Sequence, residues 1–308
     1  MRPLRNSDPS IYRNISIRTD EARLWVLPSK KNRKLIGGII ARYQEIFHIE
    51  IYAYCFLGNH YHLLIRALKR NTDEFLENVN REIARRMNWK NRRKGKFWGR
   101  RYDDIPVLSQ DDLLEAFVYI NTNPTKHGLL RNAGQWPGLT SFHQSLSEEA
   151  KTFSFTQYGH PTGQKTTNHQ LKLSVLPMFE ALSKEQRTEK ISELFEKRMA
   201  RIAEERQAQG EGFMTLEMLA EQVAGTQPKE SSTTKRPSCY TKCAELRRQF
   251  REKAKHLRQL YTQASFLFRL GKLDQLFPSF TYKPPLHRRS RKIPFTPLPD
   301  DYLLPTPA

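Results

Sequence analysis

Cysteine is scarce in this sequence, with three among 308 residues. Cys55 lies in an apolar run, and Cys239 and Cys243 are four residues apart with no second Cys or His pair nearby. So small and odd a set indicates a reducing compartment, not a disulfide framework, and it gives no support to a zinc site. We therefore expect a cytoplasmic protein.

Long apolar segments are also missing. The N-terminus lacks the apolar core of a signal peptide. No apolar run reaches the roughly 18 residues that a transmembrane helix needs. We expect neither a secretion signal nor a membrane span.

Acidic residues are too few to balance the basic ones. Asp and Glu number 32 against 52 Lys and Arg, a net charge of +20. Such a surplus calls for an anionic partner, and nucleic acid is the first choice, which would associate the protein with the nucleoid. Charge alone would equally suit a ribosomal or chromatin-type binder without chemistry. Hydrophobic residues make up 38% and aromatic residues 11%, enough for a packed core.

Residues 1–150 alternate between strand and helix patterns. A turn-forming Gly58–Asn59 pair joins two of the apolar strands into a hairpin. The predicted strands are 11–18, 51–57, 60–67 and 102–108, and the predicted helices are 29–48, 71–87 and 111–123. This order is the split βαβ pattern of an α+β, ferredoxin-like antiparallel sheet with flanking helices.

The rest of the chain changes character. Residues 151–172 are rich in Ser, Thr and Gln, and this composition predicts a linker. Residues 173–295 predict a basic, mostly helical accessory region that binds DNA, and residues 296–308 a Pro-rich tail.

The His60-Tyr61-His62 triplet lies in the predicted strand 60–67. Residues two apart on a strand share a face, so both imidazoles point the same way and Tyr61 points the other. Two neutral imidazoles make half of a divalent metal site. Read alone the triplet is weak, because many such pairs are accidental.

The predicted helix 111–123 carries a tyrosine away from its apolar stripe. At about 100° per residue, Tyr119 and Asn123 share a polar face opposite Phe117. An ordinary exposed tyrosine, and an Asn that stops the helix before Pro124, would explain the same pattern.

A basic stretch with interleaved aromatic residues separates these two motifs. Cations alone would suit a duplex backbone, whereas cations with aromatic rings suit unpaired bases. The candidate nucleic-acid-binding residues are Arg85, Arg86, Arg92, Arg93, Lys94, Lys96, Trp98, Arg100 and Arg101.

Together the motifs predict an active site that cuts DNA. A metal held by His60, His62 and Asn123 would bind the scissile phosphate, and Tyr119 would attack phosphorus to give a 5′-phosphotyrosine and a free 3′-hydroxyl. The ligand set suits Mn²⁺, with Mg²⁺ as the alternative. No phosphate-loop motif occurs, and rejoining needs no ATP because the covalent link keeps the bond energy.

Over about residues 10–145 the chain resembles the single-tyrosine HUH transposases, and within them the REP-associated tyrosine transposase branch. The matching stretches are YAYCFLGNHYHLLIRA (52–67), FWGRRYDD (97–104), YINTNPTKHGLL (119–130) and QWPGLTSF (135–142). Tyr61 and Gly58 depart from the usual aliphatic residue and Pro, and neither departure removes a catalytic group.

The resemblance implies that His60, His62 and Asn123 are metal ligands for Mg²⁺ or Mn²⁺ and that Tyr119 is the nucleophile. It also implies a transposase acting on single-stranded DNA hairpins of palindromic repeats, as a monomer or homodimer. Two alternatives stay open: a catalytically silent hairpin-binding protein, and a metal-dependent endonuclease that nicks single strands without transposing them.

Overall fold

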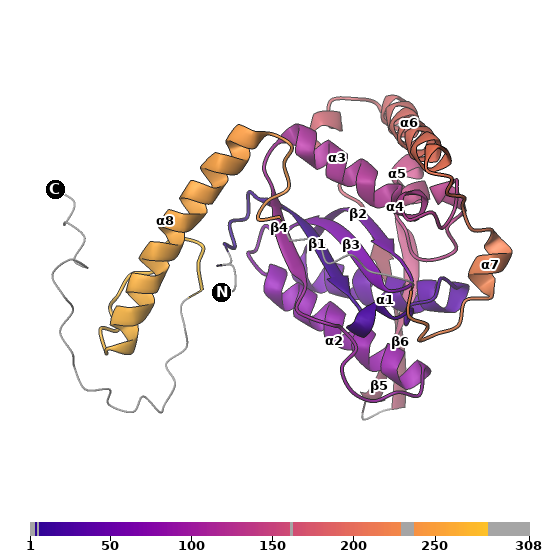
Figure 1. The fold of residues 1–308 in the computed structure, drawn as a ribbon. Coiled ribbons are helices and arrows are strands. Elements are labelled where there is room, and N and C mark those ends of the chain that lie inside the picture. The colour runs from indigo at the N-terminus through magenta and orange to yellow at the C-terminus, as the bar shows by residue number, and fades with distance from the viewer. Residues whose placement is uncertain (1–3, 5, 161–162, 229–236, 283–308) are drawn as a thin grey trace. The chain divides into compact units, whose positions relative to one another are not determined.

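The computed structural model describes residues 4, 6–160, 163–228 and 237–282. Its centre is a four-stranded antiparallel sheet in the order β2-β3-β1-β4, seen in Figure 1. The strands are β1 (Tyr12–Arg18), β2 (Glu50–Phe56), β3 (His60–Arg66) and β4 (Asp103–Val107). With a helix after β1 and another after β3, this order confirms the predicted ferredoxin-like sheet.

Helices cover both faces of this sheet. On one face lie α1 (Lys30–Phe47) and α2 (Thr72–Lys90), and on the other α3 (Gln110–Asn121), α4 (Asn123–Lys126) and α5 (Phe142–Ser147). Serine side chains fix two helix starts, because Ser29 accepts the Asn32 N–H and Ser109 accepts the Asp112 N–H. Short 3-10 turns occupy Asp20–Ala22, Ala133–Gln135 and Pro177–Phe179.

The sheet separates two hydrophobic cores. Tyr61, Leu63 and Ile65 of β3 enter the core beneath α1 and α2. Leu64 enters the core beneath α3, and by strand alternation His60 and His62 point to that same side. The alternation of β3 therefore decides which helices face the two histidines.

The segment predicted as a linker is instead a two-stranded antiparallel hairpin, β5 (Lys151–His160) with β6 (Gly163–Leu171). It packs on α1, where Gly37 and Gly38 leave room for it. A Cβ at Gly38 would collide with the Ser154 carbonyl oxygen, and one at Gly37 with the Phe153 ring. The polar composition was misleading because it hides Phe153 and Phe155, which alternate with polar residues along β5 and pack in the core that contains α1.

The chain forms two compact units, and the boundary between them does not lie at residue 150, where the sequence predicted it. One unit is Pro9–Arg247, and the other combines Met1–Asp8 with Arg248–Ala308. The first unit therefore contains α6 (Lys184–Ala208) and α7 (Leu216–Ala220), which begin the region predicted as accessory.

Most of α8 (Ala244–Arg269) belongs to the second unit, where the Ser7 N–H donates to the Phe280 carbonyl. The predicted tail 296–308 and the end of the basic region, 283–295, lie outside the described residues. Within the described part of the chain, no helix has both the length and the apolar character needed to cross a membrane.

We expect Gly38→Ala to destabilise the protein by about 1–3 kcal/mol, because the added methyl group must displace the β5 backbone. Gly212→Ala is the matched control, since a Cβ there meets nothing within 4 Å. Urea unfolding measures both variants. A Gly38→Ala protein as stable as the wild type would contradict the packing of the hairpin on α1.

Candidate active site

His60 and His62 lie side by side on β3, facing α3. Their ring centroids are 5.2 Å apart. Burial lowers the pKa of His62 to about 3, and burial followed by the neighbouring His62 lowers that of His60 well below its ordinary value. Both imidazoles are therefore neutral at pH 7, the form that binds metal ions.

The turn before β3 orients the first histidine. Asn59 Oδ1 lies 2.7 Å from His60 Nδ1, and as an acceptor it fixes the proton on that nitrogen and leaves the Nε2 lone pair free. The Asn59 amide is itself held by donating to the Ala22 carbonyl at 2.8 Å. His62 differs, because its Nδ1 is buried with no hydrogen-bond partner among the described residues.

The predicted helix 111–123 is two helices, α3 and α4, separated at Thr122. The Thr122 hydroxyl donates to the Val118 carbonyl at 2.7 Å, and the Asn121 amide oxygen accepts from the Ser141 hydroxyl at 2.7 Å. Pro124 therefore does not end the helix but opens the next one, where its missing N–H costs nothing. This break leaves Asn123 fully buried at the start of α4.

Tyr119 lies near the end of α3 and contacts His62. Its ring centroid is 5.6 Å from that of His62. Burial raises the pKa of the Tyr119 phenol, while the neighbouring Asn123 amide and the positive charges of Arg198 and Arg18 lower it. The net shift is upward, so the phenol carries its proton at neutral pH.

The Asn123 side chain is an unsatisfied buried amide. Both polar atoms of its side chain are buried with no hydrogen-bond partner among the described residues. Buried polar atoms without a hydrogen-bond partner lower the stability of the fold unless a ligand binds them. Together with the buried, unpartnered His62 Nδ1 and the free Nε2 of His60, they form a donor set of two imidazoles and one amide oxygen that fits Mn²⁺ or Mg²⁺.

Three residues of the site were missed from the sequence. His127 follows α4, and its ring centroid is 5.1 Å from that of His60. Arg18 pairs with His60 across β1 and β3, and the Arg198 guanidinium of α6 lies 5.5 Å from the Tyr119 ring centroid. His127 is a local neighbour of Asn123, so helical spacing could have suggested it; nothing in the sequence points to Arg198.

Burial lowers the pKa of His127 to about 4, so this imidazole is also neutral at pH 7. In the described part of the chain, no group of three or more His, Cys, Asp or Glu side chains is arranged to hold a metal ion. The three imidazoles thus do not converge on one point, and the amide of Asn123 is the remaining donor beside Tyr119.

Most of the predicted nucleic-acid-binding residues are accessible. Six basic side chains are exposed, and Arg93 is half-buried with its guanidinium 4.5 Å from the Trp25 ring centroid. The exposed residues are Arg85, Arg92, Lys94, Lys96, Arg100 and Arg101.

Two of these predicted residues are turned inward. Arg86 is buried, where it pairs with Glu82 and donates to the Thr156 carbonyl, so its role is to join α2 to the hairpin. The Trp98 indole packs against Tyr61 and donates to the Asn80 carbonyl. Trp89, at 80% exposure, is the tryptophan that this stretch presents to solvent.

Comparison with known proteins finds relatives of the segment that contains these residues. Residues 19–123 match the family model of IS200-like transposases. A Haemophilus influenzae protein named as a REP-associated tyrosine transposase is 28% identical over 117 residues, which cover 34% of this chain and 65% of that relative. The chain thus spans about two thirds of the length of this relative. The match extends from Thr19 to Asn123 and includes both histidines and Tyr119, so the resemblance inferred from the motifs is confirmed.

A solved structure of a REP-associated tyrosine transposase bound to a REP hairpin also resembles the chain. It shares 15% sequence identity with a TM-score of 0.40, over 48% of this chain and 84% of that one. The structural overlap is partial, and the assignment depends on the sequence match.

We expect Asn59→Ala to weaken Mn²⁺ binding about ten-fold or more, because a histidine ligand loses the partner that fixes its proton. Isothermal titration calorimetry of Mn²⁺ measures the change. Asn78→Ala is the control, because the Asn78 side chain bonds to Glu74 and Arg81 of its own helix, and this variant should bind as the wild type does. Equal affinity of both variants would remove Asn59 from the site.

The buried histidines also predict a pH dependence of stability. The His62 imidazole stays neutral in the folded protein down to about pH 3, whereas in the unfolded chain it takes up a proton near 6.5. The free energy of unfolding should therefore fall as the pH drops below 6.5, by about 1.4 kcal/mol per pH unit for each such histidine, and should not depend on this group above 6.5. Urea unfolding between pH 7 and 5 tests this, and His62→Gln should show a shallower slope; an unchanged slope would contradict the buried neutral state.

Proposed function

We propose that this chain, whose residues 19–123 carry the IS200-like transposase domain, is a transposase that cleaves and rejoins single-stranded DNA through a tyrosine–phosphate link. Tyr119 is the nucleophile, and His60, His62 and Asn123 hold a divalent ion, Mg²⁺ or Mn²⁺. The observation that carries the proposal is the position of the Tyr119 ring beside that of His62, with the unpartnered Asn123 amide next to it.

In the proposed reaction the Tyr119 oxygen attacks phosphorus, and the bond between phosphorus and the 3′ oxygen breaks. The phenol loses one proton and the leaving 3′ oxygen gains one, so the products are a 5′-phosphotyrosine and a free 3′-hydroxyl. Attack by a free 3′-hydroxyl reverses the step and rejoins the DNA. The energy of the broken bond stays in the tyrosine link, which explains why no nucleotide-binding loop is needed.

The chain's own residues supply two parts of this chemistry. Burial keeps the Tyr119 phenol protonated and holds its ring in place, while Asn123, Arg198 and Arg18 favour the ionised form in which it attacks. A bound divalent ion supplies Lewis-acid activation of the phosphate. The neutral imidazoles at the site leave nitrogen lone pairs available for that ion at neutral pH.

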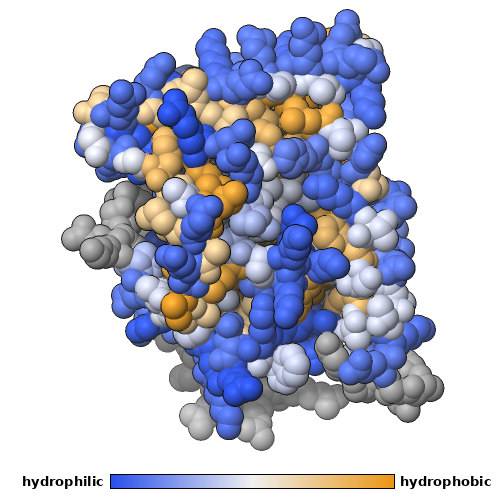
Figure 2. Space-filling model, turned by 90° about the vertical axis from the view of Figure 1, so that its right-hand side faces the viewer, coloured by the Kyte–Doolittle hydropathy of each residue, from blue (hydrophilic) through white to orange (hydrophobic). Residues whose placement is uncertain are grey.

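We propose single-stranded DNA with hairpins of palindromic repeats as the substrate. The name of the Haemophilus relative and the hairpin bound in the solved structure suggest this class. The net charge of +20 and the exposed basic stretch around Trp89 suit unpaired DNA, because cations contact the backbone and an exposed indole stacks on bases. On the face shown in Figure 2, hydrophilic side chains predominate and apolar ones form separate patches.

Two other activities make different use of the same residues. A nicking endonuclease would release the cut strand without joining it to another, and a silent binding protein would hold hairpins without cutting them. The unpartnered donors at His62 and Asn123 favour an active metal site over a silent one. A strand-transfer assay separates the transposase from the nickase, since only the transposase joins the 5′ end to a second strand.

We expect the wild-type protein with Mn²⁺ to form a covalent adduct with a labelled hairpin strand, seen on a denaturing gel. Tyr119→Phe should abolish the adduct and leave hairpin binding intact, because it removes only the attacking oxygen. Tyr240→Phe is the matched control: the Tyr240 phenol is near enough for Tyr119 to raise its pKa, and its loss should preserve the adduct. An adduct that persists in Tyr119→Phe would disprove the assignment of the nucleophile.

A further inference from the structure

Arg198 reaches the nucleophile from a helix outside the segment that matches the transposase family. Its guanidinium lies 5.5 Å from the Tyr119 ring centroid. The matched segment ends at residue 123, whereas α6 begins at Lys184. The chain therefore brings a positive charge to its candidate active site from a distant part of the sequence.

Aromatic packing fixes α6 against α3. The Phe195 ring stacks on Phe117 at 5.7 Å between centroids and also meets Phe142 at 4.9 Å. Phe195 precedes Arg198 by three residues, about one helical turn, and Phe117 precedes Tyr119 by two. The stack thus aligns Arg198 with Tyr119 through a fully buried contact.

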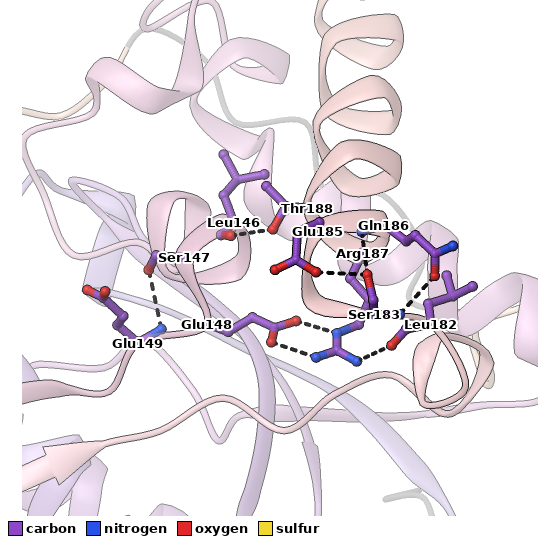
Figure 3. Close-up of polar contacts among 10 residues, drawn as sticks. All are labelled: Leu146, Ser147, Glu148, Glu149, Leu182, Ser183, Glu185, Gln186, Arg187 and Thr188. Carbon is purple, nitrogen blue, oxygen red and sulfur yellow. Dashed lines mark hydrogen bonds and ion pairs between the residues drawn. The ribbon is translucent and has the colours of Figure 1, made fainter.

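Polar contacts hold the beginning of α6, as Figure 3 shows. Arg187 makes a bidentate ion pair with Glu148, in which the Nη2–Oε2 distance is 2.8 Å. The Thr188 hydroxyl donates to the Leu146 carbonyl at 2.8 Å. Ser183 and Gln186 form a capping box that sets the first turn. The beginning of α6 is therefore held within the same compact unit as Tyr119.

The Arg198 guanidinium has no protein anion to bind. Among the described residues it makes no ion pair, and its Nε is buried without a hydrogen-bond partner. Two carboxylates of the groove beside it are engaged elsewhere: Glu115 pairs with Lys242 at 2.8 Å, and Asp112 accepts the Lys242 N–H and the Ser109 hydroxyl. An arginine with free donors in a half-buried position is unusual, because such donors are normally satisfied.

A groove gives an anion access to this arginine. It has a volume of about 850 Å³ and runs between α3 and α6, with Arg198, Val118 and Glu115 among its lining residues. If Arg198 served only to pack on the Tyr119 ring, it would need neither an open groove beside it nor an unpartnered Nε. An arginine fork beside a phenol suits one class of ligand well, a phosphate joined to that phenol.

We propose that Arg198 is a catalytic residue that binds the phosphate at Tyr119, so that α6 completes the active site. This inference rests on the proposed function. In the cleavage step described above, the guanidinium donates to a non-bridging oxygen of the phosphate as the bond to Tyr119 forms and the bond to the 3′ oxygen breaks. Arg198 forms no covalent bond and gives up no proton, because arginine stays charged in proteins.

The test uses a phosphate ligand and needs no cleavage. We measure the affinity of the full chain for a hairpin-flanking single strand that ends in a 5′-phosphate and for the same strand with a 5′-hydroxyl. The wild type should prefer the phosphate about ten-fold, the size of one charge-assisted hydrogen bond. Arg198→Gln should lose this preference and Arg198→Lys should keep part of it.

Lys190→Gln is the control, because Lys190 lies on the same helix, is exposed and is not among the residues that line the groove. It should keep the full preference, and thermal melting should show that all variants are folded. A wild type that binds both ends equally, or an Arg198→Gln variant that still prefers the phosphate, would overturn the inference.

Adduct formation is measured in parallel. Arg198→Gln should slow the covalent step about 100-fold, the usual cost of losing one donor to a transition-state oxygen. Binding of the uncut hairpin should change less than three-fold, and guanidinium ion should partly restore Arg198→Ala. Absence of any adduct in the wild type counts against the proposed transposase, whereas the 5′-phosphate preference by itself decides the role of Arg198.

Discussion

The burial of two neutral imidazoles on one face of β3 is the constraint on which the site depends. Desolvation removes the proton from His60 and His62 at any pH near neutrality and so prepares them to bind a cation. Burial has a cost, since polar atoms are left without partners at His62 and Asn123. We propose that a divalent ion would engage the acceptors of this group, namely the Asn123 amide oxygen and an imidazole nitrogen.

The sheet register and the helix break place these groups. Because His60 pairs with Arg18 and His62 with Ser16 on β1, the histidines are fixed in the middle of the sheet and not at its edge. The break at Thr122 then turns the start of α4 inward, so that Asn123 is buried. A continuous helix would have kept Tyr119 and Asn123 on one stripe but would not have fixed the amide at a helix start.

The sequence was sufficient for the parts of this arrangement that follow from local periodicity. A strand has a period of two, so the shared face of His60 and His62 could be predicted, as could the order of the four strands. Pro124 was ambiguous, because the same residue ends one helix or opens another according to the backbone before it. The β5–β6 hairpin was missed because its polar composition hides a dependence on close contact with Gly37 and Gly38.

Long-range packing explains the remaining misses. Arg198 has no sequence signal, since its position follows from the stack of Phe195 on Phe117 across two helices far apart in the chain. Composition predicted Arg86 and Trp98 at the DNA-binding surface. It cannot show that Arg86 joins α2 to the hairpin or that the Trp98 indole donates to the Asn80 carbonyl. The region assigned as accessory thus divides, because α6 belongs to the unit that contains the site.

We propose that His60, His62 and Asn123 converge on a single ion next to Tyr119. Anomalous diffraction from crystals of the full chain soaked in Mn²⁺ tests it most directly. The account predicts one strong peak bound by His60, His62 and Asn123, with the Tyr119 oxygen beside it. A peak that excludes Asn123, or that lies away from β3, would contradict the account.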